Sequence, residues 1–135
     1  MAEIKKAISD DLTLREVIGS PDIDAFMSAI QENFAGHPTK YLVWDFSEAS
    51  LSHLSTSDIQ RLVSNAKPYF QFRAGGKTAF VAPDATNYRL ARMFEAFFEL
   101  EDSPVEVQVF HDLLTAAKWI DRSRLPISHQ TKAES

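Results

Sequence analysis

The feature that most constrains this chain is a repeated alternation of short apolar runs with segments of helical periodicity. Three runs rich in aliphatic and aromatic residues, YLVWDF, KTAFVA and VEVQVF, occupy positions 41–46, 77–82 and 105–110. In the segments that follow them, apolar residues recur every three or four positions, which is the spacing of one buried helical face. Strands that alternate with helices are joined by right-handed crossovers, so we expect the three runs to be neighbouring strands of one sheet.

Two further strands are expected near the N-terminus. The segment IKKAISDDLTLREVIGS places apolar residues on both sides of the pair Asp10-Asp11, which is typical of a hairpin. The predicted fold is therefore α/β, with a mixed, mostly parallel sheet of about five strands, an N-terminal hairpin and four helices. One domain over residues 1–122 accounts for this pattern, and the loss of periodicity beyond it predicts a mobile tail over 123–135.

Composition excludes several classes of function. The chain of 135 residues has a net charge of −5, which disfavours nucleic acid as a partner because phosphate neutralisation needs clustered Lys and Arg. Cysteine is absent, so disulfides, thiolate catalysis and cysteine-bound metals are excluded. No apolar run approaches the roughly 20 residues that span a bilayer, and the N-terminus lacks the apolar core of a signal peptide. We therefore expect a cytoplasmic protein that is not transmembrane.

The sequence also shows only weak catalytic, metal-binding and cofactor motifs. The four histidines, at positions 37, 53, 111 and 129, do not have the spacing of metal ligands. For each possible nucleophile, acid–base pair or cofactor motif, a purely structural role explains the same residues at least as well. The sequence thus predicts a protein without enzymatic activity, metal or cofactor.

The stretch DFSEASLSHLSTSD, from Asp45 to Asp58, is the strongest candidate for a functional loop. It follows a strand of the predicted parallel sheet and precedes a helix. Ligands of open α/β sheets collect beyond the carboxyl ends of the strands, and a helix N-terminus offers unpaired N–H groups to anions. The residues of this candidate partner- or anion-binding loop are Asp45, Ser47, Ser55, Thr56, Ser57 and Asp58. The alternative is that Ser55 and Asp58 form an N-terminal capping box and the other hydroxyls are solvated.

Two carboxylates and two arginines are further candidates. Asp45 and Asp84 follow apolar strands and can converge as a pair, although Asp84 also suits a turn or a helix cap. Arg89 and Arg92 lie one helical turn apart and can clamp an anion. The alternative for the arginines is a solvated edge that pairs with Glu95 or with Glu99.

The chain also carries more aromatic and methionine side chains than one helical face needs. Most of them are expected in the core. A remainder left on the surface of the helices would form a homodimer contact or line a cleft for an apolar ligand, because large exposed apolar patches usually mark interaction sites. The candidates for this apolar contact are Tyr69, Phe72, Met93 and Phe97.

Three stretches, YLVWDFS, KTAFVAPDATNYRLARMFEAFFE and VEVQVFHDLLTAAKWI, resemble the STAS/SpoIIAA-like domain family, in particular its small bacterial members. The likeness covers about residues 2–122, and its most distinctive part is the closing strand that ends in Phe110, followed by a helix with Ala117 and Trp119. The resemblance implies a SpoIIAA-like βαβ superhelix. This fold is similar to that of Sec14-type lipid-binding domains.

In the anti-sigma-factor antagonists of that family, the loop after the central strand begins Asp, apolar, Ser and ends in Asp-Ser-Ser-Gly, whose first Ser is phosphorylated. Here Asp45–Ser47 match the beginning. At the end, an ungapped alignment places His53 and Leu54 at the Asp and the phospho-acceptor, whereas a two-residue insertion places Ser55 and Thr56 there, and no glycine follows. Ser55 and Thr56 are thus the candidate phospho-acceptors that the resemblance implies.

The leading prediction is a regulatory or interaction domain that meets a protein partner or an anionic ligand with the loop after the central strand. The alternative is a small domain of the Sec14-like type that binds a lipid or another apolar ligand.

Overall fold

The structure is a computed structural model that describes residues 2–34 and 38–120. The end of the predicted domain at residue 122, the predicted tail over 123–135, and two of the histidines, at positions 37 and 129, lie outside these described residues.

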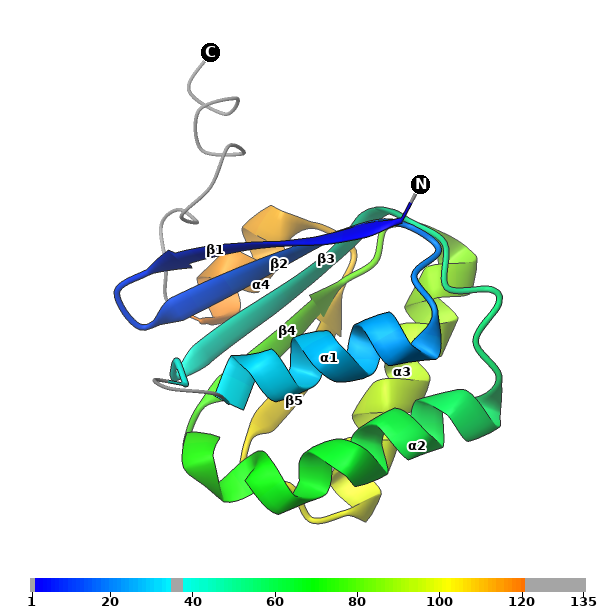
Figure 1. Cartoon of the computed structure of the whole chain (residues 1–135). Coiled ribbons are helices and arrows are strands. Elements are labelled where there is room, and N and C mark those ends of the chain that lie inside the picture. Colours follow the sequence, from blue (N-terminus) through cyan, green and yellow to red (C-terminus); the bar gives the residue numbers. More distant parts are fainter. Residues whose placement is uncertain (1, 35–37, 121–135) are drawn as a thin grey trace.

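Five strands form one sheet in the order β1-β2-β3-β4-β5, so every strand lies beside its neighbours in the sequence (Figure 1). Strands β1 and β2 pair antiparallel across the turn at Asp10 and Asp11, and the other three pairs are parallel. This confirms the predicted hairpin and the predicted neighbouring strands. The strands are β1 (Glu3–Ser9), β2 (Leu12–Gly19), β3 (Tyr41–Ala49), β4 (Lys77–Val81) and β5 (Glu106–Phe110).

Helices follow the strands as the periodicity predicts. Asp84 is the N-cap of the helix after β4, because its carboxylate accepts the N–H of Asn87 at 3.0 Å. Asp112 is the N-cap of the last helix, since its carboxylate accepts the N–H of Thr115 at 2.7 Å. The predicted role of Asp84 as a cap is thus confirmed. The helices are α1 (Ile23–Phe34), α2 (Thr56–Ala66), α3 (Ala85–Leu100) and α4 (Leu113–Trp119), with a 3-10 helix η1 (Lys67–Arg73) directly after α2.

The helices cover the two faces of the sheet unequally. On one face, which we call the front, α1, α2, η1 and α3 enclose a large core that includes Phe26, Trp44, Phe70 and Phe94 (Figure 1). On the back face, α4 alone supplies Ala116 and Ala117 to a smaller core. Successive residues of a strand point to opposite faces, so each of β2 to β5 contributes to both cores, whereas β1 contributes Ile4 to the edge of the front core.

The structure differs from the sequence analysis at two places, one within the candidate loop and one after α2. Strand β3 does not end at Phe46 but continues to Ala49, because Glu48 and Ala49 pair with Ile18 and Gly19 of β2 after a local shift of register. Ser47 therefore lies in the strand and not in the loop. Helix η1 was not expected as a separate element; Pro68 near its start provides a reason for the change from α to 3-10 geometry, since proline cannot donate a helical hydrogen bond.

Candidate functional site

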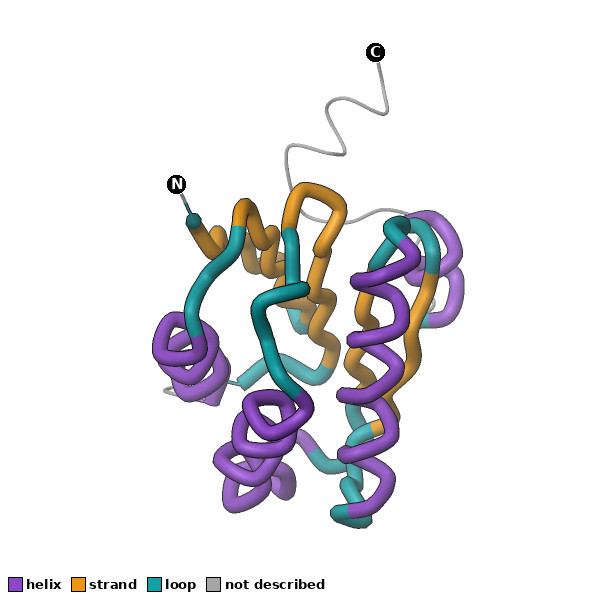
Figure 2. Tube along the Cα trace, turned by 90° about the vertical axis from the view of Figure 1, so that its right-hand side faces the viewer, coloured by secondary structure: helices purple, strands orange, loops and turns teal. Residues whose placement is uncertain are grey.

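The loop from β3 to α2, residues 50–55, crosses from the end of the sheet to the front helices (Figure 2). Two leucines anchor it: Leu51 is fully buried and Leu54 is 5% exposed. Between and beside these anchors, Ser52, His53 and Ser55 are exposed. The loop thus turns its apolar side chains into the core and its polar side chains outward.

Hydrogen bonds from other elements hold this loop. The amide oxygen of Asn87 in α3 accepts the N–H of Leu51 at 3.0 Å, and its amide nitrogen donates to the carbonyl of Ala49 at 2.9 Å. Asn87 is only 2% exposed, so both bonds lie away from water. A ring nitrogen of His53 also contacts the carbonyl oxygen of Pro21. These bonds hold the loop against α3 on one side and against the segment before α1 on the other. Sequence reasoning missed Asn87, because nothing in a helical segment shows that an amide reaches back to another loop.

The first turn of α2 contains the predicted capping box. Ser55 Oγ accepts the N–H of Asp58 at 3.0 Å, and the Asp58 carboxylate accepts the N–H of Ser55 at 3.0 Å. The bond from the Ser55 backbone lowers the pKa of the Asp58 carboxyl. Thr56 and Ser57 are exposed on the same turn, and the Thr56 hydroxyl lies 3.8 Å from the sulfur of Met93.

Asp45 and Ser47 lie away from that turn. Asp45 occupies the back face of β3, paired in register with Val81 of the back core. It is 3% exposed, and its Oδ1 accepts both the N–H and the hydroxyl of Ser47, at 2.9 and 2.5 Å. Asp84, in contrast, caps α3 on the front side of the sheet. The loop residues that the sequence groups together are thus split between the two faces, and Asp45 is not joined to Asp84.

The two arginines of the candidate clamp are exposed on α3. Arg92 Nε pairs with Glu95 Oε1 at 2.9 Å, as the alternative interpretation predicts. Arg89 is exposed one turn earlier. An ion pair already made by Arg92 reduces its capacity to bind a further anion, so the clamp is the weaker interpretation.

The candidate apolar contact is only partly accessible. Met93 and Phe97 pack against the front core, and Tyr69 is half-buried with its ring centre 6.4 Å from that of Phe72. The side chain of Phe72 is 62% exposed, so it is the member of this group that faces outward. A homodimer contact at this position stays a prediction.

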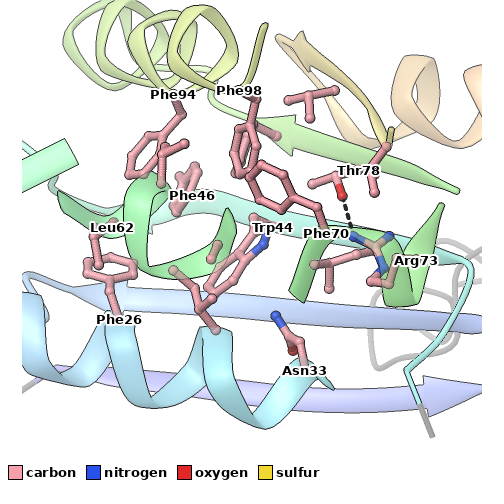
Figure 3. A pocket seen from close by; sticks show the side chains of 17 residues that line it. Phe26, Asn33, Trp44, Phe46, Leu62, Phe70, Arg73, Thr78, Phe94 and Phe98 are labelled. Carbon is pink, nitrogen blue, oxygen red and sulfur yellow. Dashed lines mark hydrogen bonds between the residues drawn. The ribbon is translucent and has the colours of Figure 1, made fainter. Parts of the chain in front are cut away.

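The aromatic residues of the front core surround a cavity of about 50 Å³ between the sheet and the helices (Figure 3). Its walls come from β3, β4, β5, all three front helices and η1, and they are largely apolar. Three polar side chains, Asn33, Arg73 and Thr78, interrupt this lining (Figure 3). The seven aromatic residues of the wall are Phe26, Trp44, Phe46, Phe70, Phe80, Phe94 and Phe98.

Arg73 closes the cavity at the amino ends of β3 and β4. Its guanidinium donates to the carbonyls of Thr39, Lys40 and Lys77 and to the hydroxyl of Thr78, at 2.8–3.1 Å. Burial lowers the pKa of Arg73 to about 10, so the side chain stays charged at neutral pH. No sequence signal marks this buried position, since an arginine shortly before a Gly-Gly turn is usually solvated.

Within residues 2–34 and 38–120, no group of three or more His, Asp or Glu side chains is placed to hold a metal ion. In the same part of the chain, no helix has the length and apolar character needed to cross a membrane.

Comparison with solved structures identifies the fold. An anti-sigma factor antagonist from Mycobacterium paratuberculosis is 17% identical with a TM-score of 0.58, over 90% of this chain and 95% of that one. An uncharacterised protein from Shewanella loihica with a SpoIIAA-like fold is 19% identical with a TM-score of 0.53, over 88% and 93%. The anti-sigma factor antagonist SpoIIAA in its unphosphorylated form is 11% identical with a TM-score of 0.51, over 87% and 94%.

No protein-family model matches the chain, and no curated protein matches it in sequence. The likeness to solved structures therefore rests on shape, and it confirms the predicted SpoIIAA-like α/β fold.

Proposed function

We propose that this chain is a non-enzymatic STAS-like interaction domain of the cytoplasm that presents the β3–α2 loop and the first turn of α2 to a protein partner. The observation that carries the proposal is a polar surface held in one conformation. Buried Leu51 and Leu54, the two bonds of Asn87 and the capping box fix the backbone, while the hydroxyls of Ser52, Ser55 and Thr56 stay exposed. A surface ordered before binding loses little conformational entropy when a partner docks.

The fold offers a precedent for such a role. Two of the similar solved structures are named as anti-sigma factor antagonists, proteins that act on another protein. At identities of 17% and 11% this precedent supports a class of function and does not supply a partner.

A phosphate at this surface would sit on Thr56 more readily than on Ser55. The Ser55 hydroxyl already accepts the N–H of Asp58, and the Asp58 carboxylate lies against the Ser55 backbone, so a phosphate there meets like charge. The exposed Thr56 begins α2, where the helix dipole favours a negative group. We therefore propose Thr56 as the phospho-acceptor if the loop is a switch.

Crosslinking inside the cell tests the interface. A photo-reactive amino acid placed at Thr56 is expected to capture a defined protein, whereas the same amino acid at Ser64, exposed near the other end of α2, is the matched control. Capture of the same set of proteins from both positions, or of none from Thr56, would refute the proposed surface. With the photo-reactive amino acid moved to the neighbouring exposed position Ser57, replacing Thr56 by Glu then tests whether a negative charge changes the capture, as a switch requires.

A second function is favoured by one specific observation, the aromatic-walled cavity. We propose that the domain also binds a small apolar ligand there, as in the Sec14-like alternative. Binding sites for small molecules are concave and mostly apolar with a few placed polar groups, which describes this cavity. Mass spectra of the native protein isolated from its own cells are expected to show bound small molecules that are lost on unfolding.

A further inference from the structure

The indole N–H of Trp44 is a buried donor without an acceptor. Trp44 is 5% exposed and lines the front cavity with its ring packed between Phe26 and Phe46. Among the residues that the structure describes, no acceptor lies within hydrogen-bonding distance of its Nε1. Buried tryptophan N–H groups usually have a partner, and an unpaired one costs free energy, so this donor calls for an explanation.

Asn33 of α1 directs a second donor toward the same space. Its Oδ1 accepts the Nε–H of Arg15 at 2.9 Å, and because that arginine nitrogen can only donate, the bond decides which end of the amide is oxygen. Arg15 itself is held by Glu32 at 2.7 Å. The amide nitrogen of Asn33 is left on the opposite side, where Figure 3 shows it directed toward Trp44. No acceptor among residues 2–34 and 38–120 pairs with this nitrogen.

Arg73 supplies a third donor and a positive charge. A guanidinium carries five N–H groups, and four of them are used by uncharged acceptors. The remaining one, on Nη1, has no acceptor in the described part of the chain. No carboxylate of that part lies within 4.0 Å of the guanidinium, so a buried cation lines the cavity without a counter-ion. A buried charge of this kind is costly unless an opposite charge compensates it.

We propose that the front cavity is a binding site for a small monocarboxylate, with the carboxylate toward Trp44, Asn33 and Arg73 and the apolar body among the phenylalanines. This deepens the second proposed function, on which it rests, by naming the class of ligand. The unpaired groups at the polar end are all donors, so they fit a ligand head that only accepts. A carboxylate meets this condition and also balances the charge of Arg73.

The size of the cavity limits the ligand. One water-sized group needs roughly 10–15 Å³, so a cavity of about 50 Å³ holds roughly three to five such groups. This is the size of a short-chain acid, whereas a long acyl chain would require the helices to move. We therefore choose propionate, a short-chain acid within this limit, as the probe, with propionamide of the same shape as its uncharged control.

The indole N–H resonances of the two tryptophans can show whether the cavity is occupied. In the full chain labelled with nitrogen-15, each indole N–H gives one resonance, and Trp119 serves as the internal control because it packs on the back face of the sheet. Propionate is expected to move the Trp44 resonance downfield in a saturable manner and to leave that of Trp119 in place. Because hydrogen bonds to charged groups are stronger than neutral ones, propionate should bind roughly tenfold or more tightly than propionamide.

A single isosteric variant tests the polar end. Asn33→Asp replaces a donor by a carboxylate without changing shape, so propionate affinity should fall at least about tenfold while Trp44 remains as the reporter. Asn65→Asp, on the exposed face of α2, adds the same charge outside the cavity and should leave propionate affinity unchanged. An equal loss in both variants, or no loss in Asn33→Asp, overturns the proposal. If Asn33→Asp does not fold, the comparison of propionate with propionamide in the unmodified chain decides.

The remaining outcomes distinguish failure of the carboxylate proposal from failure of the apolar-ligand function. If propionamide moves the Trp44 resonance as strongly as propionate, the cavity takes uncharged ligands, so the carboxylate proposal fails and the apolar-ligand function stands. If neither compound moves it, both fail. If both tryptophans respond alike, the effect is not binding in the cavity, and the carboxylate proposal fails.

Discussion

Replacing Asn87 by Ala is expected to release the loop that we propose as the partner surface. The change removes the acceptor of the Leu51 N–H and the donor to the Ala49 carbonyl, at 3.0 and 2.9 Å, from a side chain that is 2% exposed. Each lost bond is expected to cost about 1–1.5 kcal/mol, because its backbone partner stays buried. The free energy of unfolding should therefore fall by about 2–3 kcal/mol.

The loss can be followed by two measurements. With an entropy of unfolding of about 2.1 cal/mol/K per residue over 135 residues, the melting temperature should fall by about 7–11 °C. Amide hydrogen exchange resolves where the loss occurs: the Leu51 amide should exchange faster, whereas amides in the middle of β3 should follow the global stability only.

Asn65→Ala is the matched control, since Asn65 is exposed and its amide bonds only the carbonyl of Arg61 in the same helix. Its effect on the free energy of unfolding should stay within about 0.5 kcal/mol. A loss below about 1 kcal/mol in Asn87→Ala, with unchanged exchange at Leu51, would refute the role of Asn87 in holding the loop. The loop would then be held by its buried leucines alone.

Three further predictions concern the cap, the buried cation and η1. Ser55→Ala should cost about 1 kcal/mol as the lost cap. Because the folded-state pKa of Asp58 is lowered, its contribution is present at neutral pH and is lost as the pH falls through that lowered value, so stability profiles of Asp58→Asn and the parent should converge below about pH 4. Arg73→Ala should lower the free energy of unfolding by about 3–5 kcal/mol in urea titrations, because the three carbonyls and one hydroxyl that it bonds lose their donor; a loss under about 1 kcal/mol would show that water replaces the guanidinium. Within η1, Phe70→Ala should cost about 3–5 kcal/mol and Phe72→Ala under about 0.5 kcal/mol, since the two side chains are 5% and 62% exposed, and similar losses would contradict this burial.

Local patterns were sufficient to predict the fold. The three parallel strands, the hairpin at Asp10 and Asp11, and the capping box of Ser55 and Asp58 all rest on neighbours in the sequence. These signals can be read from the sequence because periodicity and helix caps depend only on a few residues on either side.

The extent of β3 and the faces of its residues were not predictable in the same way. Asp45 and Ser47 belong to a serine-rich stretch that resembles a loop, yet β2 runs far enough to pair with β3 as far as Ala49. Which face of the sheet Asp45 occupies follows from register, a property of the whole sheet. The separation of Asp45 from Thr56 is therefore information that only the assembled sheet contains.

The polar residues of the interior were missed for a related reason. Arg15, Arg73 and Asn87 are each nine-tenths buried, although composition alone places Arg and Asn at the surface. The partners of their side chains lie 14 to 38 positions away in all bonds except those of Arg73 with β4. A partial signal existed for Arg15, which shares the inward side of its strand with Val17.

The two proposed sites lie at opposite ends of the sheet, and this separation determines how they can be studied. The loop begins where β3 ends and is held by Asn87, whereas Arg73 bonds residues at the amino ends of β3 and β4. No residue bonds both Asn87 and Arg73 in the described part of the chain. Two helices are common to both sites. The first turn of α2 belongs to the loop surface and its later residues line the cavity, whereas α3 holds the loop through Asn87 and lines the cavity with Phe94 and Phe98. A variant of the loop that leaves both helices in place therefore changes partner capture without changing the cavity, so each proposal can fail while the other stands.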